Sequence, residues 1–404
     1  MTMERDTVSG ILRRLESGYQ LPPLSVIAMK LMELASSETS SINDMVELVE
    51  KDPSLAVRLL NLANSVFFSA GRRVSTLKQA AIRLGSNNLK MMALSISLRG
   101  AFPMGRIQQF DYEQFWRLSI YRALITRSLA EQSEVCNPEE AFVAGLTTEI
   151  GLPIFFDLYI KGKDEQFDLS MEPLEDLLAR EREHFGLDHR QVGKAALKYW
   201  KFPEHMIVCQ SSYGERARKG DGPILCTLGE MARLFSLMLS DESADFNAFF
   251  QEAECTLKLN TEAIHETILD TFHRVQNIAE NLKVEINKEH DLMEIMEKAN
   301  RALIRISERV AKFASGAGGK RLPSFESIDE EEKAVAHTLQ AVAHEIRNPL
   351  TAVGGFAKRL AGSLDPQSQV GRYAQVILEE ALRLEKILSS MPKQVRKPSS
   401  SSFN

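Results

Sequence analysis

Cysteine is scarce in this sequence. The 404 residues include four cysteines, at positions 136, 209, 226 and 255. The gaps between them match neither the ladder of a disulfide-stapled domain nor the C-x-x-C pair of a structural zinc site. We therefore expect reduced, mostly packed thiols in a cytoplasmic protein.

Long apolar runs and an excess of positive charge are missing as well. No stretch approaches 18 uncharged apolar residues, which predicts that no transmembrane helix is present. The first residues are charged and lack the apolar core of a signal peptide. Lys and Arg number 49 against 55 Asp and Glu, so the formal net charge is −6, whereas a nucleic-acid-binding protein needs a concentrated basic face. Neither a membrane nor a nucleic acid is an expected partner.

Patterns typical of β-strands hardly occur, and nearly all of the sequence has helical periodicity. Ser41-x-x-Asp44 is a capping-box pattern, and Asp52-Pro53 pairs an N-cap residue with a proline at the first helical position. Apolar residues then recur at helical spacing, for example Leu55, Leu59 and Leu62. These patterns predict an all-α protein.

A glycine-rich segment interrupts the helical pattern. Residues 315–324, SGAGGKRLPS, contain three glycines and a proline, which a helix does not tolerate at low cost. The last residues are polar, basic and rich in serine, which predicts a disordered tail. The expected organisation is an N-terminal helical domain at 1–280, a helical connector and hinge at 281–328, a helical hairpin at 329–391 and a tail at 392–404.

The C-terminal part carries two heptad seams, in which apolar residues alternate at spacings of four and three. The first comprises Val335, Leu339, Val342, Ile346, Pro349, Val353, Phe356 and Leu360. The second comprises Val370, Ala374, Ile377, Ala381, Leu384, Leu388 and Met391. Gly362 is expected to end the first helix, and Asp365-Pro366 to start the second. Because two helices alone cannot bury both seams well, the pattern predicts a homodimer with a four-helix bundle.

His344 lies at heptad position f, the position furthest from the bundle core. Glu345 follows it, and Asn348 lies one turn further on the same exposed face. An exposed imidazole can attack a phosphoryl group with one ring nitrogen while a carboxylate takes the proton from the other. A solvated surface histidine is the structural alternative.

The string Ala343-His-Glu-Ile-Arg-Asn-Pro-Leu350 resembles the H-box of the dimerisation and phosphotransfer hairpin (HisKA) of sensor histidine kinases. The resemblance covers about residues 333–391. It implies that His344 is the phosphoacceptor, that Glu345 is the base assisting its phosphorylation, and that Asn348 orients water when a partner's phosphoaspartate is hydrolysed.

An ATP-binding domain is the part of a histidine kinase that the sequence does not provide. No Asn-rich helix motif, glycine-rich lid or P-loop is found in the chain. We therefore expect no cofactor in this chain, and ATP and Mg²⁺ to belong to a separate kinase domain that phosphorylates His344 in trans. Whether the chain is itself an enzyme stays open.

The N-terminal part resembles an HDOD domain, an all-helical signalling relative of the metal-dependent HD phosphohydrolases. The segments that carry this resemblance include LPPLSVIAMKLMEL, VEKDPSLAVRLLNLANSVFFS and AFVAGLTTEIGLPIFF, with Asp52-Pro53 and Asn64-Ser65 the most specific.

The positions where HD enzymes hold metal have lost their ligands. Leu118 replaces an upstream histidine, Thr148-Glu149 replaces the His-Asp dyad, and residues 210–213, QSSY, replace a downstream histidine pair. His189 remains, and with one glutamate it falls short of a hydrolytic metal site. His184, His189 and His205 are therefore expected to be structural or surface residues, and phosphohydrolase activity is not expected.

Two functional hypotheses remain. In the first, an HDOD sensor or docking scaffold is coupled to a dimeric phosphotransfer hairpin, with a receiver domain of a response regulator and a separate kinase domain as partners. In the second, the chain is a non-catalytic dimeric scaffold with a vestigial H-box. Phosphohistidine at position 344 distinguishes them.

Overall fold

The computed structural model describes residues 21–22, 24–35, 41–64, 73–163, 167–169, 173–220, 222–240, 246–287, 290–291 and 353–389. The chain divides into two compact units, Met1–Lys288 and Glu289–Asn404. The predicted domain bounds stay predictions, because residues 292–352 and 390–404 lie outside the described residues.

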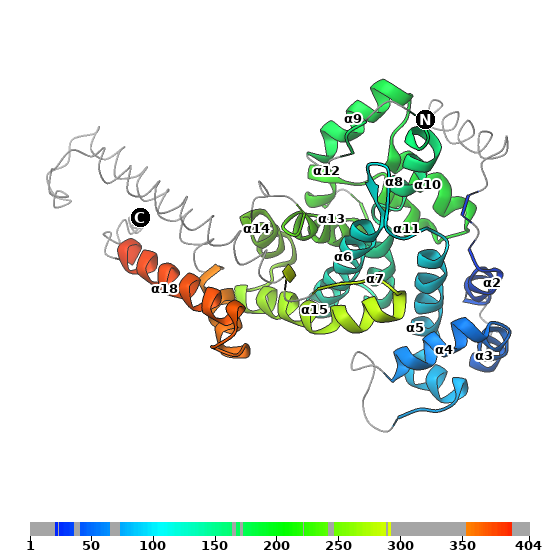
Figure 1. Cartoon of the computed structure of the whole chain (residues 1–404), viewed down its shortest axis with the longest axis horizontal. Coiled ribbons are helices and arrows are strands. Elements are labelled where there is room, and N and C mark those ends of the chain that lie inside the picture. The colour runs from blue at the N-terminus through cyan, green and yellow to red at the C-terminus, as the bar shows by residue number, and fades with distance from the viewer. Residues whose placement is uncertain are drawn as a thin grey trace, which may run out of the picture. The chain divides into compact units, whose positions relative to one another are not determined.

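The first unit is a helical domain (Figure 1). Its described elements are, in chain order, α2 (Val26–Ala35), α3 (Ile42–Glu50), α4 (Pro53–Ala63), α5 (Leu77–Gly100), β1 (Arg106–Ile107), β2 (Phe110–Asp111), α6 (Tyr112–Ser133), α7 (Pro138–Thr147), α8 (Gly151–Phe155), the π-helical turn η1 (Phe156–Ile160), α9 (Leu174–Phe185), α10 (His189–Tyr199), α11 (Glu204–Ile207), the 3₁₀ turn η2 (Val208–Gln210), α12 (Gly214–Arg218), α13 (Ile224–Leu237), α14 (Phe246–Leu257) and α15 (Thr261–Leu282). The described strands form one two-residue antiparallel pair, so the all-α fold class is confirmed.

The predicted helix starts near the N-terminus are confirmed. The Ser41 Oγ atom accepts a hydrogen bond from the Asp44 amide, and the Asp44 carboxylate accepts one from the Ser41 amide. Asp52 caps α4 by accepting from the Leu55 amide at 3.0 Å. The stripe of Leu55, Leu59 and Leu62 is buried, as its spacing predicted.

Asn64 connects the end of α4 to the segment that leads into α5. Its Oδ1 atom accepts from the Val74 amide at 2.8 Å, and its Nδ2 atom donates to the Val74 carbonyl at 2.8 Å. One asparagine side chain thus pairs with both backbone groups of Val74, as a neighbouring strand would. This explains why asparagine suits the C-cap of α4.

Helix α6 is central in the first unit, packed against α7, α13 and α15 (Figure 1). Nearly every residue of α6 from Tyr112 to Ala130 is buried, including Trp116 and Arg122. A helix buried on all sides must satisfy its polar side chains inside the protein. Two charges of α6 find hydrogen-bond partners on the same helix, Arg122 with the Ser119 hydroxyl and Arg127 with Glu131.

Helices α8 and α10 approach closely at two glycines, Gly151 and Gly193. A Cβ atom on Gly151 would meet the His189 carbonyl oxygen and would lie 2.6 Å from the Gly193 amide nitrogen. Only hydrogen fits between these backbones. The contact holds the start of α10, where His189 lies, beside the turn that carries Glu149.

One helical stretch, Pro138–Ile160, is long and apolar enough to cross a membrane by length and composition among the described residues. Most of its apolar window, 89%, is buried inside the protein, the pattern of a core helix in a soluble protein.

Within residues 353–389 of the second unit, the structure has two helices, residues 353–363 and α18 (Gln369–Ser389). The seam residues that fall within it are all buried in the single chain, namely Val353, Phe356, Leu360, Val370, Ala374, Ile377 and Ala381. The side chains of Leu384, Leu388 and Met391 and the seam before Val353 lie outside the described residues.

The predicted hairpin loop was right in one detail and wrong in another. The first helix ends at residue 363, near Gly362 as predicted, with Gly362 inside its last turn. Asp365 and Pro366 form a turn before α18 and do not begin it. The Asp365 carbonyl accepts from the Ser368 amide at 2.9 Å, and the Ser368 hydroxyl then accepts from the Gly371 amide at 2.9 Å. Serine, with its compact hydroxyl, has taken the capping role.

We predict that Gly151→Ala destabilises the domain, because the added methyl group meets backbone atoms that cannot rotate away. The free energy of unfolding should fall by about 1–3 kcal/mol or more, measured by urea denaturation. Gly100→Ala is the control, because nothing lies within 4 Å of its Cβ position. Equal effects of the two substitutions would contradict the close contact of α8 and α10.

Candidate functional site

The predicted phosphoacceptor site lies outside the described residues. His344, Glu345 and Asn348 all fall within 292–352, so the structure describes no geometry for them. The hairpin is described from residue 353 onward. The charged site that the structure does describe lies in the first unit, at the positions where HD enzymes hold metal.

The dyad position falls at the turn between α7 and α8. Thr148 donates its hydroxyl proton to the Ala144 carbonyl at 2.8 Å, which caps the end of α7. Glu149 is completely buried, and Leu118 is buried on α6. Gln210 of the QSSY segment donates to the carbonyls of Thr147 and Thr148 at 2.9 and 3.2 Å, so it supports this turn.

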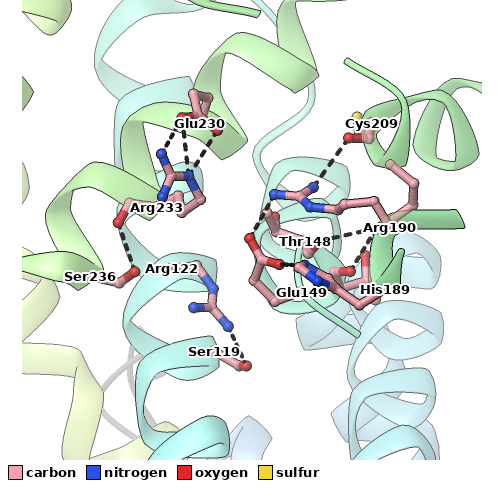
Figure 2. A network of polar contacts seen from close by, with 12 residues as sticks. Ser119, Arg122, Thr148, Glu149, His189, Arg190, Cys209, Glu230, Arg233 and Ser236 are labelled. Carbon is pink, nitrogen blue, oxygen red and sulfur yellow. Dashed lines mark hydrogen bonds and ion pairs between the residues drawn. The ribbon is translucent and has the colours of Figure 1, made fainter. Parts of the chain in front are cut away.

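His189 lies between two buried carboxylates, of which Figure 2 labels Glu149. Its Nε2 atom is 2.8 Å from Glu149, and its Nδ1 atom is 2.8 Å from Glu181 on α9. The Glu181 carboxylate also accepts the His189 backbone amide at 2.8 Å. Because an ionised carboxylate only accepts hydrogen bonds, both ring nitrogens must carry protons. His189 is therefore an imidazolium.

Arg190 completes the pairing of Glu149 from the next position of α10. Its Nη2 atom donates to Glu149 Oε1 at 2.6 Å, while His189 occupies Oε2. Its Nη1 atom reaches the Cys209 carbonyl at 3.5 Å, and its guanidinium lies over the Tyr213 ring. Both oxygens of Glu149 are thus engaged with protein cations.

Two further buried arginines lie near this group (Figure 2). Arg233 makes a bidentate pair with Glu230 on α13, with its shortest contact at 2.7 Å. Arg122 donates to the Ser119 hydroxyl at 2.8 Å and has no carboxylate hydrogen bond among the described residues. We call these four cations and three carboxylates the buried charge cluster, which comprises Arg122, His189, Arg190, Arg233, Glu149, Glu181 and Glu230.

The pKa values follow from this arrangement. Burial alone would lower the pKa of His189, but the carboxylates of Glu181 and Glu149 outweigh it and raise it to about 9. Burial alone would raise the pKa of Glu149, but Arg190 and the hydrogen bond from His189 hold it well below the usual range. Burial lowers the pKa of Arg122 to about 10, which leaves it charged at neutral pH.

This donor set does not fit a divalent metal. The groups of the dyad region that could bind a cation, Glu149 and His189, are occupied by ion pairs, and Leu118 and Thr148 are not metal ligands. The buried charge cluster also holds one cation more than it holds carboxylates, and a metal ion would add charge of the same sign. Protein cations stand where a metal would have to bind.

The other two histidines named in the sequence analysis, His184 and His205, lie outside the buried charge cluster. His184 contacts the rings of Phe167 and Phe185. His205 is exposed, with its Nε2 atom 3.3 Å from Glu140. His184 thus packs among aromatic rings, His205 lies at the surface, and His189 belongs to the buried charge cluster.

Sequence reasoning missed the other five members of the buried charge cluster, namely Glu181, Glu230, Arg122, Arg190 and Arg233. One signal could have found part of the set. Glu149 lies in the apolar stretch AFVAGLTTEIGLPIFF, and Arg122 lies on a helix whose neighbours are mostly apolar. A charge within a buried stretch needs a partner of opposite sign elsewhere in the chain.

Two family models match the chain. The HDOD domain model matches residues 21–213, and the HisKA model, described as the phospho-acceptor domain of histidine kinases, matches residues 334–392. The chain thus contains an HDOD domain followed by a HisKA domain, as the two resemblances implied.

The curated relatives each match only part of this chain. The sensor histidine kinase ZraS of Escherichia coli K12 is 37% identical over 73 residues, which are 18% of this chain and 16% of ZraS. The uncharacterized protein YuxH of Bacillus subtilis is 23% identical over 133 residues, 33% of this chain and 32% of YuxH. The chain therefore spans less than a fifth of the histidine kinases that it matches.

Solved structures resemble the first unit. A structure from Shewanella amazonensis SB2B, provisionally named a phosphohydrolase, has a TM-score of 0.52 at 21% identity, covering 67% of this chain and 97% of that chain. An HDOD domain protein of unknown function from Geobacter sulfurreducens has a TM-score of 0.49 at 17% identity, covering 69% and 97%. The first of these likenesses shows the fold alone.

The matches define the class of protein. An HDOD domain and a HisKA domain in one chain, with ZraS as a relative of the second, make this a signal-transduction protein of the two-component type.

We predict that His189 titrates near pH 9 in the folded protein. Because this pKa lies above the unfolded value of 6.5, the stabilisation is complete below pH 6.5 and is lost as the pH rises through 9. The free energy of unfolding should therefore fall by about 3 kcal/mol between these limits. NMR of the imidazole nitrogens measures the pKa directly, and denaturation at several pH values measures the loss.

His205→Gln is the control for this titration, because His205 is exposed and should leave the pH dependence unchanged. His189→Gln should flatten the slope and destabilise the domain by about 3–5 kcal/mol, since two carboxylates lose a buried partner. A His189 imidazole that titrates below pH 7 would contradict the doubly paired cation.

We also predict that the first unit binds no catalytic metal. Elemental analysis of the purified chain by mass spectrometry should find no stoichiometric Mn or Fe, because the donor atoms are already paired. Stoichiometric metal together with phosphodiesterase activity that disappears in His189→Ala would show that the ion pairs open to admit a metal.

Proposed function

We propose that the chain is a phosphorelay protein in which His344 accepts and passes on a phosphoryl group, with the HDOD domain as its sensor or docking scaffold. The observation that carries this proposal is the register of the hairpin. The buried residues Val353, Phe356 and Leu360 have the a and d spacing of the heptad. Continued backward through the HisKA match, this repeat assigns His344 to position f, where a kinase and a receiver could both reach it.

The residues around His344 suit phosphoryl transfer. One ring nitrogen attacks phosphorus, and Glu345 takes the proton from the other nitrogen, which keeps the ring neutral and nucleophilic. Asn348, one turn away, holds a water against a phosphorylated receiver when the reaction runs as dephosphorylation. These roles are extended from the HisKA match to the residues of this chain.

The kinase half acts in trans in this proposal. The 404 residues hold no P-loop, Asn-rich helix or glycine-rich lid. ATP and Mg²⁺ belong to a partner kinase domain, and a response-regulator receiver domain exchanges the phosphoryl group with His344. The chain itself carries the histidine and the surfaces that both partners recognise, and it works in the cytoplasm.

The first unit serves as a binding module. Its metal positions hold ion pairs in place of ligands, so hydrolysis has no support from the buried charge cluster. A rigid helical domain can still bind a ligand or a partner and alter the connector that precedes the hairpin.

The hairpin dimerises in this proposal through its exposed apolar side chains. On α18, Val376 is 48% exposed and Leu382 is 55% exposed, whereas Ile377 is buried within the single chain. Both side chains lie outside the buried seam of the 21-residue helix α18. In this proposal a second copy packs on that face of α18 and covers them.

Phosphorylation of the purified chain tests the proposed function. The chain alone should not label itself from ATP. With a competent kinase domain it should acquire an acid-labile, base-stable phosphate that disappears in His344→Ala. Glu345→Ala should reduce the labelling rate by about 10²–10⁴-fold, because general base assistance is lost. Asn348→Ala should spare labelling and impair dephosphorylation of a receiver.

Two results would contradict parts of this proposal. Labelling of the isolated chain by ATP would reveal a nucleotide site within it. Failure to label with any kinase domain or phosphorylated receiver, in a protein whose helices are intact by circular dichroism, would favour the non-catalytic scaffold with a vestigial H-box.

A second prediction concerns the dimer. Val376→Asp combined with Leu382→Asp should convert the dimer to a monomer in light scattering, because charges would be buried without partners. Val57→Asp, which places the same charge on an exposed valine of α4 in the first unit, is the control and should leave the dimer intact. Substituting the buried Ile377 would instead unfold the hairpin. A dimer that survives the double change would place the interface elsewhere.

A further inference from the structure

Cys209 and Cys226 form a buried pair of thiols that the buried charge cluster does not use. Cys209 lies in η2 and Cys226 near the start of α13, and they are separated by 17 positions in the chain. Their Sγ atoms are 3.2 Å apart, within reach of an S–H···S hydrogen bond. Both side chains are buried, with exposed fractions of 8% and 3%. The contact comes from the fold, since the sequence spacing resembles no disulfide motif.

We propose that Cys209 and Cys226 are a reversible disulfide site whose oxidation by a peroxide joins η2 to α13. A disulfide has an S–S distance of about 2.05 Å, so the sulfurs need to move together by about 1 Å. Movement of that size is within the rotation of two cysteine side chains. The site is independent of the function proposed for the hairpin.

The surroundings favour Cys226 as the attacking thiol. A hydrogen bond from the Cys209 thiol lowers the pKa of Cys226, with the Ser212 hydroxyl and the Arg190 charge acting in the same direction against burial. The same contact and burial raise the pKa of Cys209. The thiolate is the nucleophile in thiol oxidation, so the pair divides into an attacking and a resolving sulfur.

The reaction balances with hydrogen peroxide as the oxidant. The Cys226 thiolate attacks one peroxide oxygen, the O–O bond breaks, and Cys226 sulfenic acid and hydroxide form. The Cys209 sulfur then attacks the Cys226 sulfur, the S–O bond breaks, and water leaves with the proton of Cys209. Two thiols are oxidised to one disulfide, and one peroxide is reduced to water. A dithiol reductant reverses the change.

The pair is connected to the buried charge cluster by two contacts of η2. The Cys209 carbonyl accepts from Arg190, which pairs with Glu149. The next residue, Gln210, donates to the carbonyls of Thr147 and Thr148, in the turn that carries Glu149. A disulfide that displaces η2 therefore acts on the turn beside His189.

Peptide mapping of the full chain tests the site. Reduced protein is treated with hydrogen peroxide, alkylated with N-ethylmaleimide and digested with trypsin. Cleavage after Lys201, Arg216, Lys219 and Arg233 places Cys209 and Cys226 on separate peptides, residues 202–216 and 220–233. We expect these two peptides to be joined by a disulfide in most molecules, and to separate after dithiothreitol.

Matched variants separate this pair from the other thiols. Cys136 is half-buried and Cys255 is exposed, so the Cys136→Ser, Cys255→Ser double variant should still form the cross-link. Cys209→Ser should abolish it. Two results would overturn the proposal. In the first, peroxide oxidises Cys136 or Cys255 while Cys209 and Cys226 are both still alkylated. In the second, Cys226 accumulates as a sulfinic acid.

Two measurements on the wild-type chain need no variant. Closing the loop between η2 and α13 should raise the Tm by about 5–10 °C, reversibly with dithiothreitol. The NMR signals of the His189 imidazole should shift on oxidation, because η2 contacts the cluster. An unchanged Tm would contradict a native-state disulfide, and unchanged His189 signals after complete oxidation would overturn the connection to the cluster.

Discussion

The doubly paired imidazolium of His189 is the interaction on which the centre of the first unit depends. Each of its nitrogens faces a carboxylate at 2.8 Å, and the two carboxylates come from different parts of the chain. Three elements therefore converge on one ring: α9 through Glu181, the turn after α7 through Glu149, and α10 through His189 itself. Removing the ring would take one buried cation from both carboxylates, leaving Glu149 with Arg190 and Glu181 with the His189 backbone amide.

The buried charge cluster explains how an HD-like domain can keep its shape without a metal. In a metal site, a cation draws carboxylates and imidazoles together from separate helices. Here, protonated side chains supply that positive charge from within the chain. In the proposed function, this domain is a structural and binding module, and the phosphoryl transfer takes place in the HisKA hairpin.

The sequence predicted features that depend on neighbours a few residues apart. The capping box of Ser41 and Asp44, the N-cap at Asp52 and the buried stripes of α4 and α18 follow from local spacing and were confirmed. The predicted start of α18 was wrong because the sequence offers two possible N-caps. Ser368 caps the helix in the structure, and Asp365-Pro366 does not.

The cluster and the thiol pair could not be predicted in the same way. Glu149 and His189 are 40 positions apart, and Cys209 and Cys226 are 17 positions apart, so no periodic pattern connects them. A single sequence shows that a buried charge needs a partner, but it does not show which one. The partner of each buried charge is determined only by how the helices pack.

These long separations in sequence also determine how the domain unfolds. The ion pair of Arg190 with Glu149 spans 41 positions, and the bonds of Gln210 to the turn after α7 span more than 60. Each of these contacts joins two segments that are far apart in the chain, and it is lost when either of the two leaves. Loss of one segment would expose unpaired charges in an apolar interior, so partly open forms are disfavoured. This region is therefore expected to fold and unfold as a single cooperative unit.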